Sequence, residues 1–344
     1  ELNNQKNYGE SMSAVNNLAK KLILKRDLSP EGRVTNYKGR IRQAIAAISA
    51  NLTKLVLLNL LMVVACAPLI ATYFVMRSQE AAAVAGLNFS TGIGVGFGIT
   101  DDTLLAIERI YDIRLMGYGL SIFPTCLLVG LFASGLYYCC RNMLWGAKVK
   151  LVKHFLRGIK AHWYKFMISF AWLGALATGF ACSLITVLKE TALNGSANAG
   201  WWVLMIFIGI LAFLSALYMM VGQGMYVTYK YNMKEYIVNT CCLTMIMILP
   251  AIIVTVFFSG VMALSFINVA GMFILVVMVM IGFSAFAMFN LAFSQYTTDN
   301  FILYMYEEEQ KAILKEQEKL AKQRNKEKKK QAQKNNFQGK KKKR

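Results

Sequence analysis

Six apolar runs of about twenty residues constrain this chain more than any other feature. They are 55–76, 116–140, 166–188, 201–225, 236–259 and 270–293. A helix of 22 residues rises about 33 Å, which is enough to cross the hydrocarbon core of a bilayer. Because a helix pairs its own backbone groups in lipid, each run is predicted to be a transmembrane helix. The expected fold class is all-α, a polytopic membrane protein with about six spans.

The composition agrees with a membrane protein and excludes several other classes. Apolar residues make up 56% of the chain, yet the net charge is +20. The two values are compatible because the basic residues lie mostly outside the apolar runs. A soluble enzyme, a disulfide-stapled secreted domain and a disordered chain do not have this composition.

Lysine and arginine indicate the orientation of the spans. Of the 38 basic residues, 34 lie in the two terminal segments and in the loops 141–165 and 226–235, and 4 lie in the alternate loops. Basic residues mark the cytoplasmic side, so both termini are predicted to be cytoplasmic. Aromatic residues are expected at the two membrane edges: Trp201 and Trp202 outside, and Tyr137, Tyr138, Trp145 and Trp163 inside.

The domain organisation follows from this topology. Residues 1–54 are a basic cytoplasmic arm, 55–293 the membrane domain, and 294–344 a cytoplasmic tail. The segment 77–115 is an outer insert, with a helix expected around 102–113. From Lys319 to Arg344 the tail has 13 basic residues and one acid, so its distal part is expected to be disordered. It serves either as an orientation signal or to bind polyanions, such as anionic lipid headgroups or ribosomal RNA.

Loop 148–165 has the pattern of a basic amphipathic helix in the inner leaflet interface. Apolar side chains recur at helical spacing, and basic ones occupy the other face. The predicted docking or lipid-surface residues are Lys150, Lys153, Phe155, Arg157, Lys160 and Trp163. The alternative is an ordinary cytoplasmic loop with accidental periodicity, and the sequence does not separate docking on protein from docking on lipid.

The sequence offers no catalytic, metal or cofactor site. All seven cysteines fall in apolar runs, without C-x-x-C spacing, and no nucleotide-binding, hydrolase or metalloprotease motif occurs. We therefore expect neither an enzyme nor a cofactor. The spans also lack the intramembrane ionisable groups of ion-coupled transporters. Besides serine and threonine, their polar groups are amides, which either join helices by hydrogen bonds or line a polar cavity: Asn59, Asn239 and Asn290, with Gln223 as a further amide within a span.

Small residues and prolines predict how the spans pack and bend. One face of the third span is formed by small side chains, which allow close helix approach: Ala171, Gly174, Ala175, Thr178 and Cys182. Prolines at 68, 124 and 250 interrupt three spans and are expected to kink them.

Four segments share residue types and order with a known family. They are Asn59–Leu61 leading to Pro68; Pro124 through Gly130 to 135–138 and 141–142; Phe155–Lys160 leading to Trp163; and Tyr226–Tyr231 followed by Asn239 and Leu249–Pro250. In these segments the chain resembles the YesL-like family of bacterial membrane proteins. The resemblance implies a helical bundle in a bacterial plasma membrane and an accessory role beside a carbohydrate transporter. It implies no catalytic or ligand residues.

Three functions remain open at this stage. The first is a non-enzymatic accessory protein that supports a carbohydrate transporter and docks on transporter subunits through 148–165. The second is a membrane-insertion or ribosome-tethering factor that uses the basic tail. The third is a channel or carrier for a neutral solute, with a cavity lined by Asn59, Asn239 and Asn290.

Overall fold

The computed structural model describes residues 40–85, 101–229, 232–264 and 276–298. Most of the basic arm and of the tail, as well as part of the outer insert, lies outside the described residues. The described residues are 93% helical and contain no strand. The prediction of an all-helical polytopic membrane protein is therefore confirmed for this part of the chain.

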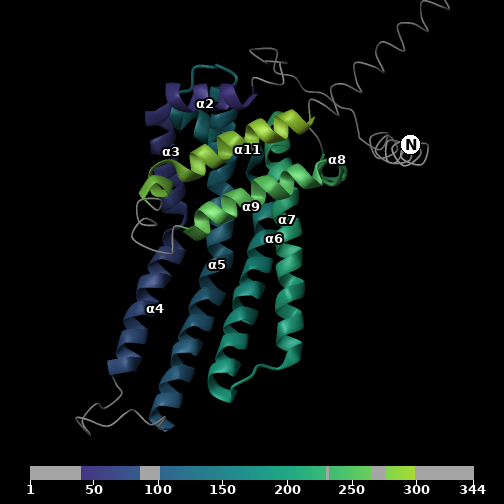
Figure 1. Cartoon of the computed structure of the whole chain (residues 1–344). Coiled ribbons are helices and arrows are strands. Elements are labelled where there is room, and N and C mark those ends of the chain that lie inside the picture. Colours follow the sequence, from purple (N-terminus) through teal and green to yellow (C-terminus); the bar gives the residue numbers. More distant parts are fainter. Residues whose placement is uncertain (1–39, 86–100, 230–231, 265–275, 299–344) are drawn as a thin grey trace, which may run out of the picture. The chain divides into compact units, whose positions relative to one another are not determined.

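Three long helices form the centre of the fold. They are α5 (Asp101–Leu144), α6 (Leu151–Asn194) and α7 (Ala199–Thr228). Figure 1 shows them side by side in alternating directions, and α5 packs most extensively against α6, and α6 against α7. Both turns use glycine at positive φ, Gly146 at 73° and Gly195 at 76°, where a side chain would be strained.

Shorter helices flank this centre. On the N-terminal side are α2 (Arg40–Ala50), α3 (Leu52–Ala65) and α4 (Ala67–Ala85), of which α4 packs along α5. On the C-terminal side are α8 (Met233–Ile246), α9 (Ile248–Leu264), a π-helix η2 (Met278–Gly282) and α11 (Phe283–Thr298). Figure 1 shows α9 and α11 running obliquely to the long helices.

The number of spans is four to six within the described residues. Four helices are long and apolar enough to cross a membrane, and two bent pairs, α2–α3 at 88° and α8–α9 at 85°, could each form one more. The six-span prediction is the upper end of this range. The predicted first span divides at Cys66 between α3 and α4, and the predicted fifth span bends at Met247.

The prolines have two different effects on the helices. Pro68 and Pro250 lie in the first turns of α4 and α9, directly after these breaks, where the missing N–H is tolerated. Pro124 lies inside α5, which continues through it to Leu144. The sequence therefore located the interruptions near 68 and 250, whereas proline at 124 does not end its helix.

Two predicted elements are parts of longer helices. The expected outer helix around 102–113 is the beginning of α5, and the predicted amphipathic segment 148–165 leads directly into α6. Each of these helices has 44 residues and is about 66 Å long, roughly twice the thickness of the hydrocarbon core. There is no break in α6 after residue 165, so the amphipathic segment is not a helix separate from the third span.

Candidate functional site

A cavity of about 600 Å³ lies between the long helices and the C-terminal helices. Its wall is mostly apolar and comes from α3, α5, α6, α7, η2 and α11, with Met62, Leu136, Phe170 and Phe286 among its lining residues. Two polar side chains also line it, Tyr137 and Gln223. The volume falls within the range of small-molecule sites, which are typically apolar with a few polar groups.

The two polar lining residues belong to a buried hydrogen-bonded cluster with Asn290. The Nδ2 of Asn290 donates to the hydroxyl oxygen of Tyr137 at 2.6 Å and to Oε1 of Gln223 at 3.0 Å. The Tyr137 hydroxyl also donates to Oε1 of Gln223. All three side chains are at most 5% exposed. One uncharged polar cluster thus joins α5, α7 and α11 beside the cavity.

Some hydrogen-bonding capacity in this cluster is left over. The Nε2 of Gln223 has no acceptor among the described residues, although Gln223 lines the cavity. The Oδ1 of Asn290 is buried and accepts no hydrogen bond from the same part of the chain. A buried polar group without a partner costs about 1–3 kcal/mol, so a bound molecule that pairs with the Gln223 amide would gain affinity.

Asn59 stabilises a wall of the cavity instead of lining it. Its Nδ2 donates to the carbonyl oxygens of Met278 at 3.1 Å and Val279 at 2.5 Å, and its Oδ1 accepts from the Ser284 amide at 3.0 Å. These backbone groups lie in or next to η2, where the α-helical hydrogen-bond pattern is interrupted. Asn59 therefore satisfies backbone groups that the π-helix leaves without α-helical partners.

Residues 162–344 match the model of the family described as MFS transporter MMSYN1_0478-like, and this match covers more than half of the chain. The chain belongs to this family. The match extends from α6 to the tail and includes Gln223 and Asn290, while Tyr137 precedes it. No curated protein and no solved structure matches the chain.

Membership of the MFS transporter MMSYN1_0478-like family refines the expectation from the sequence. It agrees with a bacterial membrane family, as the resemblance implied, but does not confirm the YesL-like name. Together with the apolar helices, it is consistent with a membrane protein associated with transport.

The structure separates the three amides that the sequence grouped as a cavity lining. Asn59, Asn239 and Asn290 are all at most 1% exposed, and none of them is a lining residue of the cavity. Asn290 forms hydrogen bonds with the lining residues Tyr137 and Gln223, and Asn59 forms hydrogen bonds with backbone groups of η2. Asn239 is buried in α8.

Two lining residues with polar groups were not assigned to the cavity from the sequence. Gln223 was recognised as an amide within a span but was not grouped with the others. Tyr137 was expected at the inner membrane edge, yet it is 3% exposed inside the cluster. A polar side chain near the end of the apolar run 201–225 was the available signal for Gln223.

The predicted docking residues divide between two sides of α6. Phe155 is 6% exposed and packs edge-on against Phe132 of α5, with 5.9 Å between ring centres. The basic residues Lys150, Lys153, Arg157 and Lys160 are exposed, as is Trp163 at 47%. Phe155 thus contributes to the core of the fold, while the other five remain on the surface.

Proposed function

We propose that this protein is a non-enzymatic carrier for an uncharged, largely apolar solute, which binds in the cavity beside Tyr137 and Gln223. The observation that carries the proposal is the cavity of about 600 Å³, whose polar groups are the Tyr137 hydroxyl and the Gln223 amide, with Nε2 of Gln223 left to donate to a ligand. No charged side chain is among its lining residues in the described part of the chain. A charged solute would therefore lose its hydration without gaining a counter-charge.

The polarity of the wall distinguishes between uncharged solutes. A sugar carries many hydroxyl groups, each of which needs a hydrogen-bond partner when it leaves water. The cavity offers them only Tyr137 and Gln223, beside aromatic and aliphatic side chains. A molecule with one or two polar groups on an apolar body fits this surface better than a sugar does.

A variant that fills the cavity tests the proposal. Ala285 lines the cavity, so Ala285→Phe places a ring in space that is empty in the native fold. A panel of tritiated compounds, from apolar alcohols through nucleosides to hexoses, first identifies the ligand that binds best. The affinity for this ligand should fall about tenfold or more in the variant, because the ligand loses its buried contact. Equilibrium dialysis of the purified protein measures binding, and uptake into proteoliposomes measures transport of ligands that do not cross empty vesicles.

Two comparison variants make the outcome specific. Ala175→Phe makes the same change at an exposed position on α6 and should leave binding unchanged. Gln223→Leu should lower the affinity for ligands that carry a polar group about fivefold, which is the contribution of one hydrogen bond. It should have little effect on the affinity for wholly apolar ligands. The carrier proposal is wrong if no uncharged solute binds, or if Ala285→Phe binds as well as the native protein.

An accessory role beside a carbohydrate transporter is a second candidate. The observation that favours it is the surface of the first turns of α6, where apolar Val152, Leu156 and Trp163 are 69, 53 and 47% exposed among basic residues. Such a surface suits either transporter subunits or anionic lipid headgroups. Co-purification of transporter subunits from native membrane, lost on Leu156→Glu, would support this role. The insertion factor and the binding of ribosomes or RNA depend on the tail, outside the described residues, and stay predictions from its charge.

For the membrane topology we propose both termini in the cytoplasm of a bacterium, with the protein in its plasma membrane. The support is the distribution of lysine and arginine. In a variant without its seven native cysteines, Ser196→Cys should react with an impermeant maleimide on intact cells. Lys150→Cys should react only after permeabilisation. Labelling of position 150 from outside would reverse the topology. Ser196 is preferred over its neighbour Gly195, whose positive φ would strain a cysteine.

A further inference from the structure

A second, smaller pocket lies between α4, α5 and α6, apart from the cavity described above. Its volume is about 320 Å³. Its polar lining consists of two arginines, one glutamate and three tyrosines: Arg77, Arg114, Glu80, Tyr73, Tyr111 and Tyr118. Met76, Ile185 and Leu188 supply an apolar wall. The pocket thus combines cationic donors with a surface for carbon groups.

One carboxylate holds the two guanidinium groups in place. Arg114 donates through Nε to Glu80 at 2.7 Å, and Arg77 donates through Nη1 to the other carboxylate oxygen at 3.1 Å. Arg77 also donates through Nε to the Tyr73 hydroxyl at 3.2 Å. The hydrogen bond from Arg114 lowers the pKa of the Glu80 carboxyl, so the carboxylate stays ionised at neutral pH.

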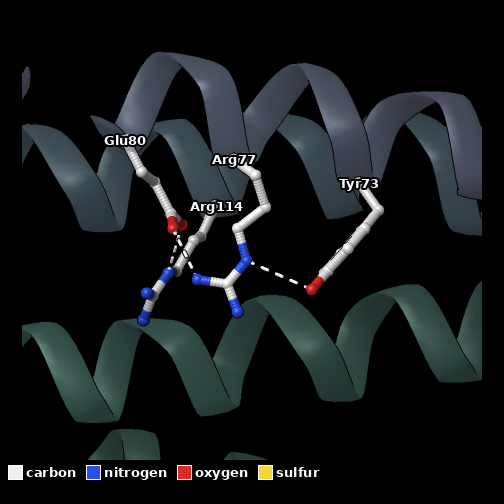
Figure 2. A network of polar contacts seen from close by, with 4 residues as sticks. All are labelled: Tyr73, Arg77, Glu80 and Arg114. Atoms are coloured by element: carbon white, nitrogen blue, oxygen red, sulfur yellow. Dashed lines mark hydrogen bonds and ion pairs between the residues drawn. The ribbon is translucent and has the colours of Figure 1, made fainter. Parts of the chain in front are cut away.

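The remaining guanidinium nitrogens are available to a ligand. Nη2 of Arg77 and both terminal nitrogens of Arg114 have no acceptor among the described residues. In Figure 2 the terminal nitrogens of both groups lie on the same side, away from the helix that carries Arg77 and Glu80. The side chains are 58% and 37% exposed, so the protein does not enclose them.

The charge of the pocket favours an anion. Two guanidinium groups and one carboxylate leave one positive charge. The nearby acids Glu108 and Asp112 both pair with Lys189, at 3.1 and 2.7 Å, which neutralises one of their two charges, and neither acid is among the lining residues of the pocket. An anion between the two arginines would therefore find charged hydrogen-bond donors at short range, where the positive charge of the lining residues acts most strongly.

We propose that this pocket binds a phosphate group that carries an organic substituent. A phosphate has enough oxygens to accept from two guanidinium groups at once, and arginine forms paired hydrogen bonds with it. The apolar wall accommodates the substituent. A phospholipid headgroup and a soluble phosphate ester both have this chemistry. This site is independent of the solute cavity, and neither proposal depends on the other.

Two binding measurements distinguish the sources. In detergent, equilibrium binding of radiolabelled glycerol phosphate tests a soluble ester. In nanodiscs of phosphatidylcholine with added phosphatidylglycerol, native mass spectrometry of the released protein tests retention of the anionic lipid. Binding in either arm should weaken about tenfold or more in Arg114→Gln, since a hydrogen bond to a charged group is lost along with the charge. Arg77→Gln should also weaken binding of the phosphate ligand. Because Arg77 is the more exposed side chain, this variant should fold even if Arg114→Gln does not.

Arg109→Gln is the matched control. Arg109 is exposed on the same helix as Arg114 and is not a lining residue of the pocket, so this variant removes one charge without changing the site. Its affinity should stay within about twofold of the native protein, because an exposed charge outside the site is screened by salt. The proposal is overturned if neither phosphate ligand binds, or if Arg109→Gln weakens binding as much as the two pocket variants do.

Discussion

Replacing Gly158 with alanine should destabilise the protein by about 1–3 kcal/mol, and replacing it with leucine should prevent α5 and α6 from packing. A Cβ at 158 would lie 2.6 Å from Cβ of Tyr138, 3.0 Å from Cα of Gly135 and 3.1 Å from the Ser134 carbonyl oxygen. Two of these three atoms belong to the backbone, so a side-chain rotation cannot relieve the clash. Thermal unfolding in detergent, followed by size-exclusion chromatography, measures the loss.

Gly179→Ala provides the control within the same helix. Its Cβ would meet Cδ1 of Ile208 at 3.5 Å, which is an ordinary van der Waals contact. Because alanine favours a helix over glycine by up to about 1 kcal/mol, this variant should be neutral or slightly more stable. Equal stability of Gly158→Ala and Gly179→Ala would mean that the contact of α5 with α6 is not as close as the structure has it.

The glycines between α5 and α6 show which part of this packing could be predicted from the sequence. The small residues of the third span predicted close approach, and a Cβ at Gly174 would indeed lie 2.7 Å from Cβ of Cys126 on α5. Among the described glycines between α5 and α6, the shortest such distance, 2.6 Å at Gly158, lies outside that span, in the segment predicted as an amphipathic helix. Glycine there was not distinguishable from glycine in a loop until the partner backbone was known.

The apolar runs predicted the helices well but not their ends. A run of apolar residues shows where a helix is stable in lipid, since its backbone groups pair within the segment. It does not show whether the helix stops at the membrane surface. In α6 no proline or turn sequence separates the basic residues from the apolar ones, so the helix continues from Leu151 to Asn194. The same reason applies to the charged first turns of α5.

The candidate site was less predictable because it depends on how three helices are rotated. The sequence identified Asn290 and Gln223 as amides in apolar runs. Only the packing of α7 against α5 and α11 brings them to Tyr137. Tyr137 lies next to Tyr138, whose ring stacks with the Arg141 guanidinium at 4.5 Å, so neighbouring tyrosines in one helix face different surroundings. From residue type alone, Tyr137 and Tyr138 were both expected at the inner membrane edge.

Asn59→Leu should destabilise the protein by about 1–3 kcal/mol, because it removes three hydrogen bonds between the fully buried Asn59 side chain and backbone groups in or next to the π-helix. The carbonyl oxygens of Met278 and Val279 lose a donor, and the Ser284 amide loses its acceptor. Leucine has the same number and branching of side-chain heavy atoms as asparagine, so the substitution leaves no cavity and the loss reports mainly the hydrogen bonds. Hydrogen exchange of the Ser284 amide should become faster, and thermal unfolding should occur at a lower temperature.

Two further substitutions separate the hydrogen bonds from the change in polarity. Asn194→Leu makes the same replacement at an exposed position on α6 and should leave stability unchanged. Asn59→Asp keeps the shape and can still accept from the Ser284 amide, but an ionised carboxylate cannot donate to Met278 and Val279. It should therefore destabilise at least as much as leucine, since it also buries a charge. If Asn59→Leu retains both native stability and slow exchange at Ser284, these bonds do not maintain the π-helix. In that case the wall of the solute cavity depends on packing alone.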